Sequence, residues 1–180
     1  MSEDRGRPIG TFSGKRLHPL DPRPEEITIE DIAHGLANTC RYGGQCQFYY
    51  SVGTHSLYVS RELADHGPEM QLYGLFHDAA EAYITDIPRP LKRELDGYDG
   101  IEQDILSAVW DHLSLSRPSP EQWQTVMNAD DRLFYYESET LLAEFDPPTV
   151  PSLPYDLEPC EPETVRRKFE QRATQLYNQM

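Results

Sequence analysis

The chain has 180 residues, of which 38% are apolar and 26% are charged, and it contains 11 tyrosines and 6 phenylalanines. This length suits one domain, which can bury enough surface to fold without disulfides. The aromatic content argues against a disordered chain, and the sequence has no apolar run of about 18 residues such as a membrane helix needs. The N-terminus lacks the apolar stretch of a signal peptide, and three unpatterned cysteines indicate free thiols, so we expect a cytoplasmic protein.

The charge balance is strongly acidic, with 16 Lys and Arg against 31 Asp and Glu, a formal net charge of −15. Such a surface repels the phosphate backbone of nucleic acids, so neither a nucleic-acid partner nor a membrane partner is expected. An anionic small molecule would have to bind where a few cations are placed together.

The first 27 residues contain several proline and glycine breaks and no sustained period, and they predict an extended arm. Thr28 is a good N-cap for a short helix that ends near residue 38. Gly43-Gly44 indicates a turn. The apolar spacing after Tyr49 then predicts a second helix, which Gly67-Pro68 ends.

A third helix is predicted over 68–85; it is apolar on several sides, as a central buried helix would be. Pro88 and Pro90 end it in a loop. A fourth helix is expected over 101–113, and a fifth from about residue 120 to Phe145.

The end of the chain holds a proline-rich linker and a terminal helix over 162–180. No strand with clear alternation and no internal repeat is visible. The sequence therefore predicts an all-α protein, a compact bundle of about five to seven helices. We divide it into an extended N-terminal arm (1–27), a core (28–146), and a linker with a C-terminal helix packed on the same domain (147–180).

The stretch FHDAAEAY in the third predicted helix places His77, Asp78 and Glu81 among apolar residues. Charged groups are rarely buried without a partner or a metal ion. Glu81 follows His77 by one helical turn, on the same face. His77 and Asp78 diverge by about 100° around the helix axis, so both can bind one ion only in a crevice between helices.

Other ligands would have to come from neighbouring helices. His55 lies amid apolar residues in the second predicted helix, and Asp130 lies in the fifth. Two imidazoles and two carboxylates form a site of borderline softness that suits Zn, Mn, Co or Fe. Each of these residues could singly have a structural role, and Asp131 is an alternative to Asp130.

These residues belong to a longer pattern. The pair His77-Asp78 is followed by Glu81, by Asp86, and by the run PRPLK from Pro88 to Lys92; Arg41-Tyr42 precedes His55 by 14 residues. The pattern resembles the HD superfamily of metal-dependent phosphohydrolases, in particular its 5′-deoxynucleotidase and deoxynucleoside-triphosphate hydrolase branch. The resemblance extends from Pro19 to Glu144.

The resemblance implies a role for each matched residue. The metal ligands would be His55, His77, Asp78 and Asp130, and the ion could be Zn, Co, Mn, Mg or Fe. Catalytic roles fall to Glu81, which would orient or deprotonate the attacking water, and to Asp86, which would support the site. The substrate-binding residues would be Arg41 and Lys92 on phosphate and Tyr42 and Pro90 beside the sugar or base.

The expected function is metal-dependent hydrolysis of a (deoxy)nucleotide at its α-phosphate, with release of either phosphate from a monophosphate or triphosphate from a dNTP. Two alternatives remain open: an HD phosphodiesterase that acts on another nucleotide, and a nucleotide-binding sensor without catalysis. We also expect a homo-oligomer, either a dimer or a hexamer.

Overall fold

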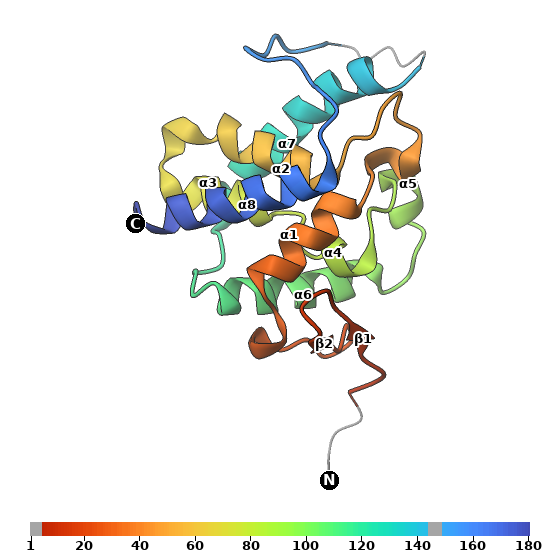
Figure 1. Ribbon diagram of the computed structural model, residues 1–180, viewed down its shortest axis with the longest axis vertical. Coiled ribbons are helices and arrows are strands. Elements are labelled where there is room, and N and C mark those ends of the chain that lie inside the picture. Colours follow the sequence, from red (N-terminus) through yellow and green to blue (C-terminus); the bar gives the residue numbers. More distant parts are fainter. Residues whose placement is uncertain (1–4, 144–148) are drawn as a thin grey trace.

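A computed structural model describes residues 5–143 and 149–180, and its architecture is all-α, as predicted (Figure 1). A two-stranded antiparallel sheet, β1 (Ile9–Gly10) with β2 (Arg16–Leu17), precedes the helices and pairs Ile9 with Leu17. The α-helices are α1 (Ile29–Asn38), α2 (Val52–Glu62), α3 (Pro68–Phe76), α4 (Glu81–Ile84), α5 (Arg89–Lys92), α6 (Tyr98–His112), α7 (Pro120–Leu141) and α8 (Pro162–Tyr177). Short 3₁₀ turns are η1 (Pro24–Glu26), η2 (Arg41–Gly44) and η3 (Ala64–His66).

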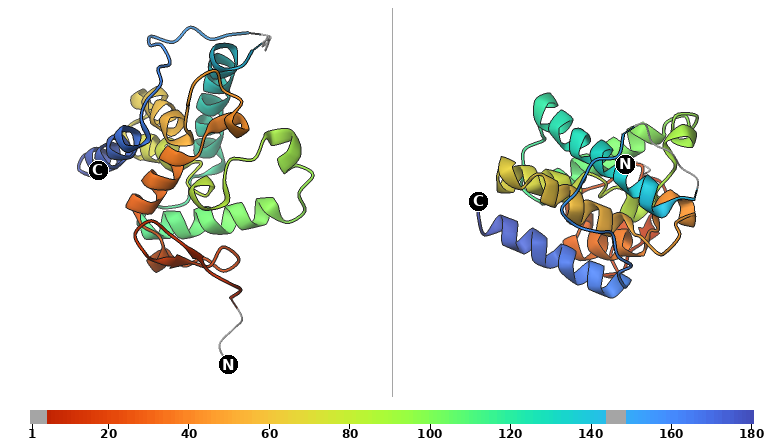
Figure 2. Two further views of the ribbon diagram at one scale, coloured as in Figure 1. Left: turned by 45° about the vertical axis from the view of Figure 1, so that its right-hand side comes forward. Right: turned by 90° about the horizontal axis from the view of Figure 1, so that it is seen from above.

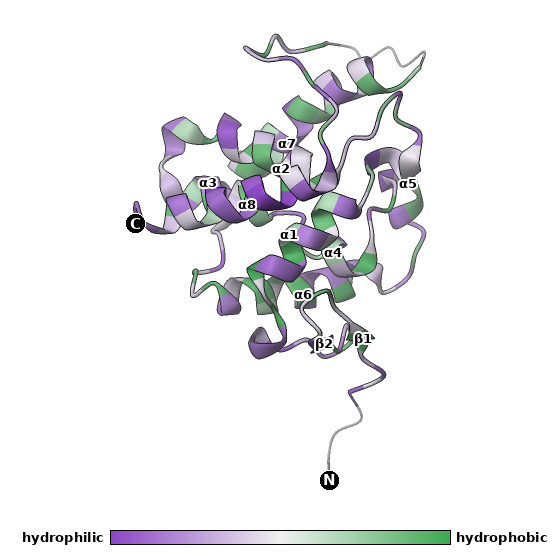
Figure 3. Cartoon of the chain, in the orientation of Figure 1, coloured by the Kyte–Doolittle hydropathy of each residue, from purple (hydrophilic) through white to green (hydrophobic). Residues whose placement is uncertain are grey.

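The core forms where α1, α2, α3 and α8 pack together, and α8 contacts each of the other three helices (Figures 1 and 2). The inward face of α8 contributes Phe169, Ala173 and Leu176, all fully buried. Its outward face is hydrophilic (Figure 3). This amphipathic division explains why the terminal helix is an integral part of the bundle.

The N-terminal segment, expected as an extended arm, forms the small hairpin and is bound to the bundle. Leu17 and Ile27 are fully buried. Asp31 in α1 accepts hydrogen bonds from Ser13 N at 2.7 Å, Ser13 Oγ at 2.8 Å and Thr28 Oγ1 at 2.7 Å. Thr28 also caps α1 as predicted, because its side chain accepts from the Asp31 amide. The strands have two residues each, too few for the alternation that identifies a strand in sequence.

The third predicted helix is wrong in one respect, since α3 ends at Phe76 and α4 begins at Glu81. The backbone between them tightens: Ala79 N donates to Phe76 O and Glu81 N to Asp78 O, both spanning three residues rather than four. His77 and Asp78 therefore lie on a tight turn that directly follows α3. The approach of α4 to α1 requires Gly35, where a Cβ atom would lie 2.6 Å from the Ala82 carbonyl oxygen.

Three predicted boundaries also differ. Residues 89–92, expected in a loop, form α5 after the N-capping Pro88. Helix α6 begins at Tyr98, and α7 ends at Leu141 rather than near Phe145. Phe145 and the proposed domain boundary after residue 146 lie outside the described residues. No helix within the described ranges is both long and apolar enough to cross a membrane.

Candidate metal centre

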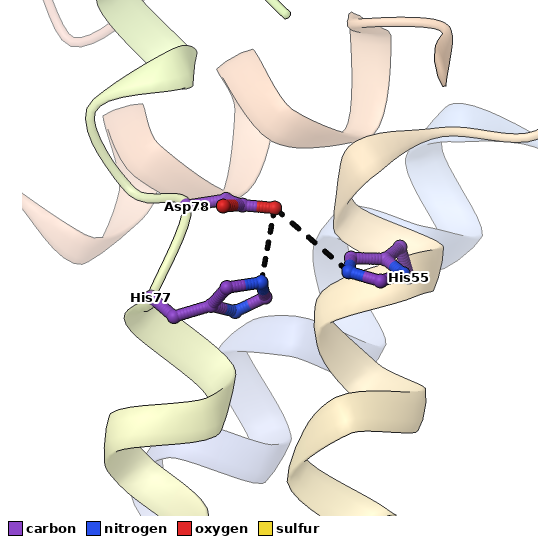
Figure 4. Close-up of side chains that lie close together, drawn as sticks. All are labelled: His55, His77 and Asp78. Atoms are coloured by element: carbon purple, nitrogen blue, oxygen red, sulfur yellow. Dashed lines mark ion pairs between the residues drawn. The ribbon is translucent and has the colours of Figure 1, made fainter. Parts of the chain in front are cut away.

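Three of the four predicted metal ligands lie together. His55 extends from α2, while His77 and Asp78 lie on the turn after α3 (Figure 4). One potential ligand atom from each residue falls within 4.8 Å of the others. Asp78 Oδ2 is 3.1 Å from His77 Nε2 and 3.9 Å from His55 Nε2. The carboxylate oxygen points between the two imidazole rings, as one shared cation would require.

The other nitrogen of each imidazole is held from outside the cluster. His77 Nδ1 lies 2.8 Å from the Gly74 carbonyl oxygen, which can only accept, so Nδ1 carries the proton. His55 Nδ1 lies 2.7 Å from Glu137 Oε1. Both Nε2 atoms are buried, and among the described residues their nearest polar neighbours are carboxylate oxygens, without a hydrogen bond of good geometry. Such outer contacts fix the ring and present the Nε2 lone pair to a metal ion, so the donor set fits a divalent ion.

The fourth predicted ligand, Asp130, lies outside this three-residue cluster but next to it. Its Oδ1 is 3.0 Å from His55 Nε2, and its Oδ2 is 2.6 Å from the guanidinium of Arg89. Arg89 also binds Asp131 at 2.7 Å. Asp130 is buried and Asp131 is exposed, so of the two neighbours only Asp130 adjoins the imidazoles.

Glu137 is a site residue that our sequence interpretation missed. It is fully buried in α7, binds His55 Nδ1, accepts a hydrogen bond from Tyr50 at 2.8 Å and lies 3.1 Å from Arg41 Nε. Burial opposes its charge, but Arg41 and His55 hold the pKa of Glu137 below its usual range. The sequence does carry a signal, because Glu137 follows Asp130 by seven residues on the apolar face of α7.

Glu81 is buried beside the ligands, and its Oε2 has no hydrogen-bond partner among the described residues. Burial, and then the carboxylates of Asp78 and Asp86, raise the pKa of Glu81 well above its usual range. Burial also raises the pKa of Asp86, whose Oδ2 accepts from the Tyr42 amide at 3.2 Å. A buried carboxyl group with a raised pKa can exchange protons near neutral pH.

The cluster borders a cleft of about 650 Å³ that Asp78, Glu81 and Asp130 help to line. All four predicted substrate-binding residues line it as well, namely Arg41, Tyr42, Pro90 and Lys92. Phe134 and Met127 form apolar wall from α7, a contribution that the sequence did not reveal. A cleft of this volume can enclose a nucleotide.

Two of the predicted substrate-binding residues are constrained by the fold. Tyr42 has a left-handed backbone (φ 56°), which is strained for a residue with a side chain and is found most often at functional sites. Its ring lies 6.2 Å from that of Phe134. Lys92 forms an ion pair with Glu102 and lies over the Tyr98 ring. Lys92 is therefore partly neutralised, and Tyr42 lines the cleft while its hydroxyl donates to Glu137 Oε2 at 3.5 Å.

No family model matches the chain. The chain is 40% identical over 101 residues to YfdR of Escherichia coli K12, an uncharacterised protein, an alignment that covers 56% of this chain and 55% of YfdR. It is also 40% identical over 115 residues to an uncharacterised protein of Rhodobacter capsulatus, covering 60% of this chain and 58% of the relative. The chain thus spans somewhat more than half the length of these curated relatives, and neither description states an activity.

Proposed function

We propose that the protein is a divalent-metal-dependent phosphohydrolase of the HD type that acts on (deoxy)nucleotides. The observation that carries the proposal is the pair of buried Nε2 atoms of His55 and His77, which face carboxylate oxygens of Asp78 and Asp130 at the edge of a nucleotide-sized cleft. Imidazole and carboxylate ligands suit Zn, Mn, Co or Fe, with Mg as a harder alternative. A divalent ion bound here would activate water and neutralise charge on a phosphate.

The residues of the chain have separate tasks in this proposal. Glu81 accepts the proton of the attacking water, for which its raised pKa and its position beside Asp78 are suited. Arg41, held by Glu137, binds the phosphoryl oxygens as a planar fork. Tyr42 and Phe134 border the space for the base or sugar.

The charges around the cleft favour a monophosphate substrate over a triphosphate. The lining holds four cations (Arg41, Arg89, Lys92, Arg93) and five acids (Asp78, Glu81, Asp86, Asp130, Asp131). With Glu81 ionised as this role requires, the acids exceed the cations by one. One divalent ion then leaves the lining with a small net positive charge, which suits the charge of a phosphate monoester. A triphosphate would bring an excess of negative charge, so we favour 5′-deoxynucleotidase activity over dNTP triphosphohydrolase activity.

The decisive experiment incubates the purified protein, loaded separately with Mn, Co, Zn or Mg, with all NMPs, dNMPs and dNTPs, and identifies products by chromatography. We expect phosphate release from dNMPs, and loss of that release in Asp78→Ala. Triphosphate release would support the triphosphohydrolase alternative. A metal-loaded protein that binds nucleotides without hydrolysing them would support the sensor alternative, and hydrolysis of a phosphodiester alone would support the phosphodiesterase.

The oligomeric state stays a prediction. Leu91 and Leu95 are 54% and 40% exposed, and such apolar side chains commonly pack against another subunit. Light scattering of the purified protein distinguishes a monomer from the expected dimer or hexamer.

A further inference from the structure

A second cavity, of about 510 Å³, lies between α2, α8 and the segment 158–160. The face of α2 that lines it holds Thr54, Leu57, Tyr58 and Arg61, spaced by three or four residues. Neither His55 nor His77 nor Asp78 borders this cavity. It is therefore separate from the candidate metal centre, although α2 contributes to both.

Positive charge is concentrated in this cavity. Its lining contains three cations, Arg61, Lys168 and Arg172, and a single acid, Glu158. Lys168 and Arg172 are one turn apart on α8, an arrangement of like charges that destabilises a helix. In a chain of net charge −15, three cations on one cavity are unexpected unless an anion balances them.

Within the described ranges, none of the three cations forms an ion pair with a carboxylate. Arg61 lies over the Tyr155 ring at 4.4 Å, and that ring stacks on Tyr58. Lys168 has only a weak contact with Cys160 Sγ at 4.0 Å. These contacts orient the two side chains while leaving their charge uncompensated.

Arg172 shows the same property more strongly. Its guanidinium donates to Ser60 Oγ at 3.4 Å, to Gln175 Oε1 at 3.2 Å and to Gln71 Oε1, all of them neutral acceptors. Burial alone lowers its pKa, since no acid nearby opposes the desolvation. By contrast, Arg41, Arg89 and Lys92 in the first cleft each have a carboxylate partner.

We propose that this second cavity, here called the α2–α8 cavity, binds a phosphorylated small metabolite. The two guanidinium forks and the ammonium group are suited to a phosphate group, which arginine binds in a planar, bidentate manner. Leu57, Pro159 and Val165 supply an apolar wall for an organic body, and the volume is typical of small-molecule sites. The proposal is independent of the function proposed for the metal centre.

The test measures binding by calorimetry, with inorganic pyrophosphate, inorganic phosphate and AMP as probes. Metal-free wild type and Lys92→Gln are both titrated, because Lys92 lines the first cleft and does not line the α2–α8 cavity. We expect pyrophosphate to bind both proteins equally, and AMP to bind more tightly than inorganic phosphate. Weaker pyrophosphate binding in Lys92→Gln would place the anion in the first cleft and overturn the proposal.

Charge-removal variants locate the site. Arg61 and Lys168 are both exposed, so their replacement leaves the core intact. Arg61→Gln and Lys168→Gln should each weaken pyrophosphate binding about 10- to 150-fold, the effect of one charge-assisted hydrogen bond. Arg167→Gln is the matched control, because Arg167 precedes Lys168 on α8 but does not line the cavity. The proposal would be overturned if pyrophosphate bound Arg61→Gln, Lys168→Gln and Arg167→Gln with equal affinity, or if it did not bind the wild type. It would also be overturned if AMP bound no more tightly than inorganic phosphate.

Discussion

Two buried carboxylates, Asp31 in α1 and Glu81 in α4, have opposite surroundings. Asp31 accepts hydrogen bonds from the side chains of Ser13, Thr28 and Thr11 and from one backbone amide. Burial opposes its charge, but these donors hold the pKa of Asp31 below its usual range. One Glu81 oxygen has no hydrogen-bond partner in the described part of the chain, and burial with nearby carboxylates raises the pKa of Glu81.

The difference shows that burial alone does not identify a functional acid. A buried group that is fully hydrogen-bonded stabilises one conformation, as Asp31 does by joining the N-terminal hairpin to α1. A buried polar group without a hydrogen-bond partner raises the free energy of the folded state unless a ligand supplies the missing contact. Glu81 has this second property, so the comparison can be tested at both regions.

The largest effect is expected at Asp78, the carboxylate that lies between the two imidazoles. Asp78→Ala should lose bound metal and fall below detectable hydrolysis, because the ion loses its charged ligand. Elemental analysis and circular dichroism give metal content and helix content. Asp131→Ala is the control and should retain both metal and activity; equal metal in wild type and Asp78→Ala would contradict the assignment.

Removing the proposed proton acceptor should have the next largest effect. Glu81→Gln keeps the shape of the side chain but cannot accept a proton, so kcat should fall about 10²- to 10⁴-fold while bound metal is retained. Steady-state kinetics with the preferred dNMP, alongside elemental analysis, measure both. A variant with the kcat of the wild type would remove Glu81 from the reaction, and loss of metal would make it a ligand.

A smaller effect is expected at Glu137, which contacts His55 from outside the cluster. Glu137→Gln should weaken metal binding about 10- to 100-fold, because the imidazole loses the carboxylate that fixes its orientation. Competition with a fluorescent chelator gives the affinity. Glu139→Gln, nearby on α7 and without such a contact, is the matched control; equal affinities in the two variants would contradict the role.

At Asp31, whose carboxylate is fully hydrogen-bonded, a substitution should affect stability alone. Asp31→Ala leaves the hydroxyl and amide donors of Ser13 and Thr28 without their acceptor, and should lower the free energy of unfolding by about 1–3 kcal/mol. Urea unfolding measures this loss, and kcat per folded molecule should stay at the value of the wild type. A reduced kcat in folded Asp31→Ala would contradict the assignment of a purely structural role to Asp31.

The smallest effect concerns the dependence of stability on pH near the hairpin. Glu26 is partly buried, which opposes its charge, but bonds from Arg5 and His18 lower its pKa from 4.5 to about 2. Because the folded pKa is the lower one, its stabilisation is present above pH 4.5 and is lost as pH falls toward 2. Urea midpoints at pH 6 and pH 3 should therefore differ less in Glu26→Gln than in the wild type.

The sequence by itself determined the all-α class, the Thr28 cap and the chain positions of the second, fourth, fifth and terminal helices to within a few residues. These features follow from local spacing and capping chemistry, which act between residues close in the chain. The sequence also identified His55, His77 and Asp78 as candidate members of one site, since polar residues in apolar helices are rarely buried without a partner or a ligand.

Only the tertiary structure decided the remaining features, because they depend on contacts between residues far apart in the sequence. The tight turn after Phe76 exists where α4 packs against α1 at Gly35, a contact that helical periodicity cannot reveal. The partnership of Glu137 with His55 joins α7 to α2, 82 residues apart. The uncompensated charges of the α2–α8 cavity likewise arise from packing, since each cation alone resembles an ordinary surface residue.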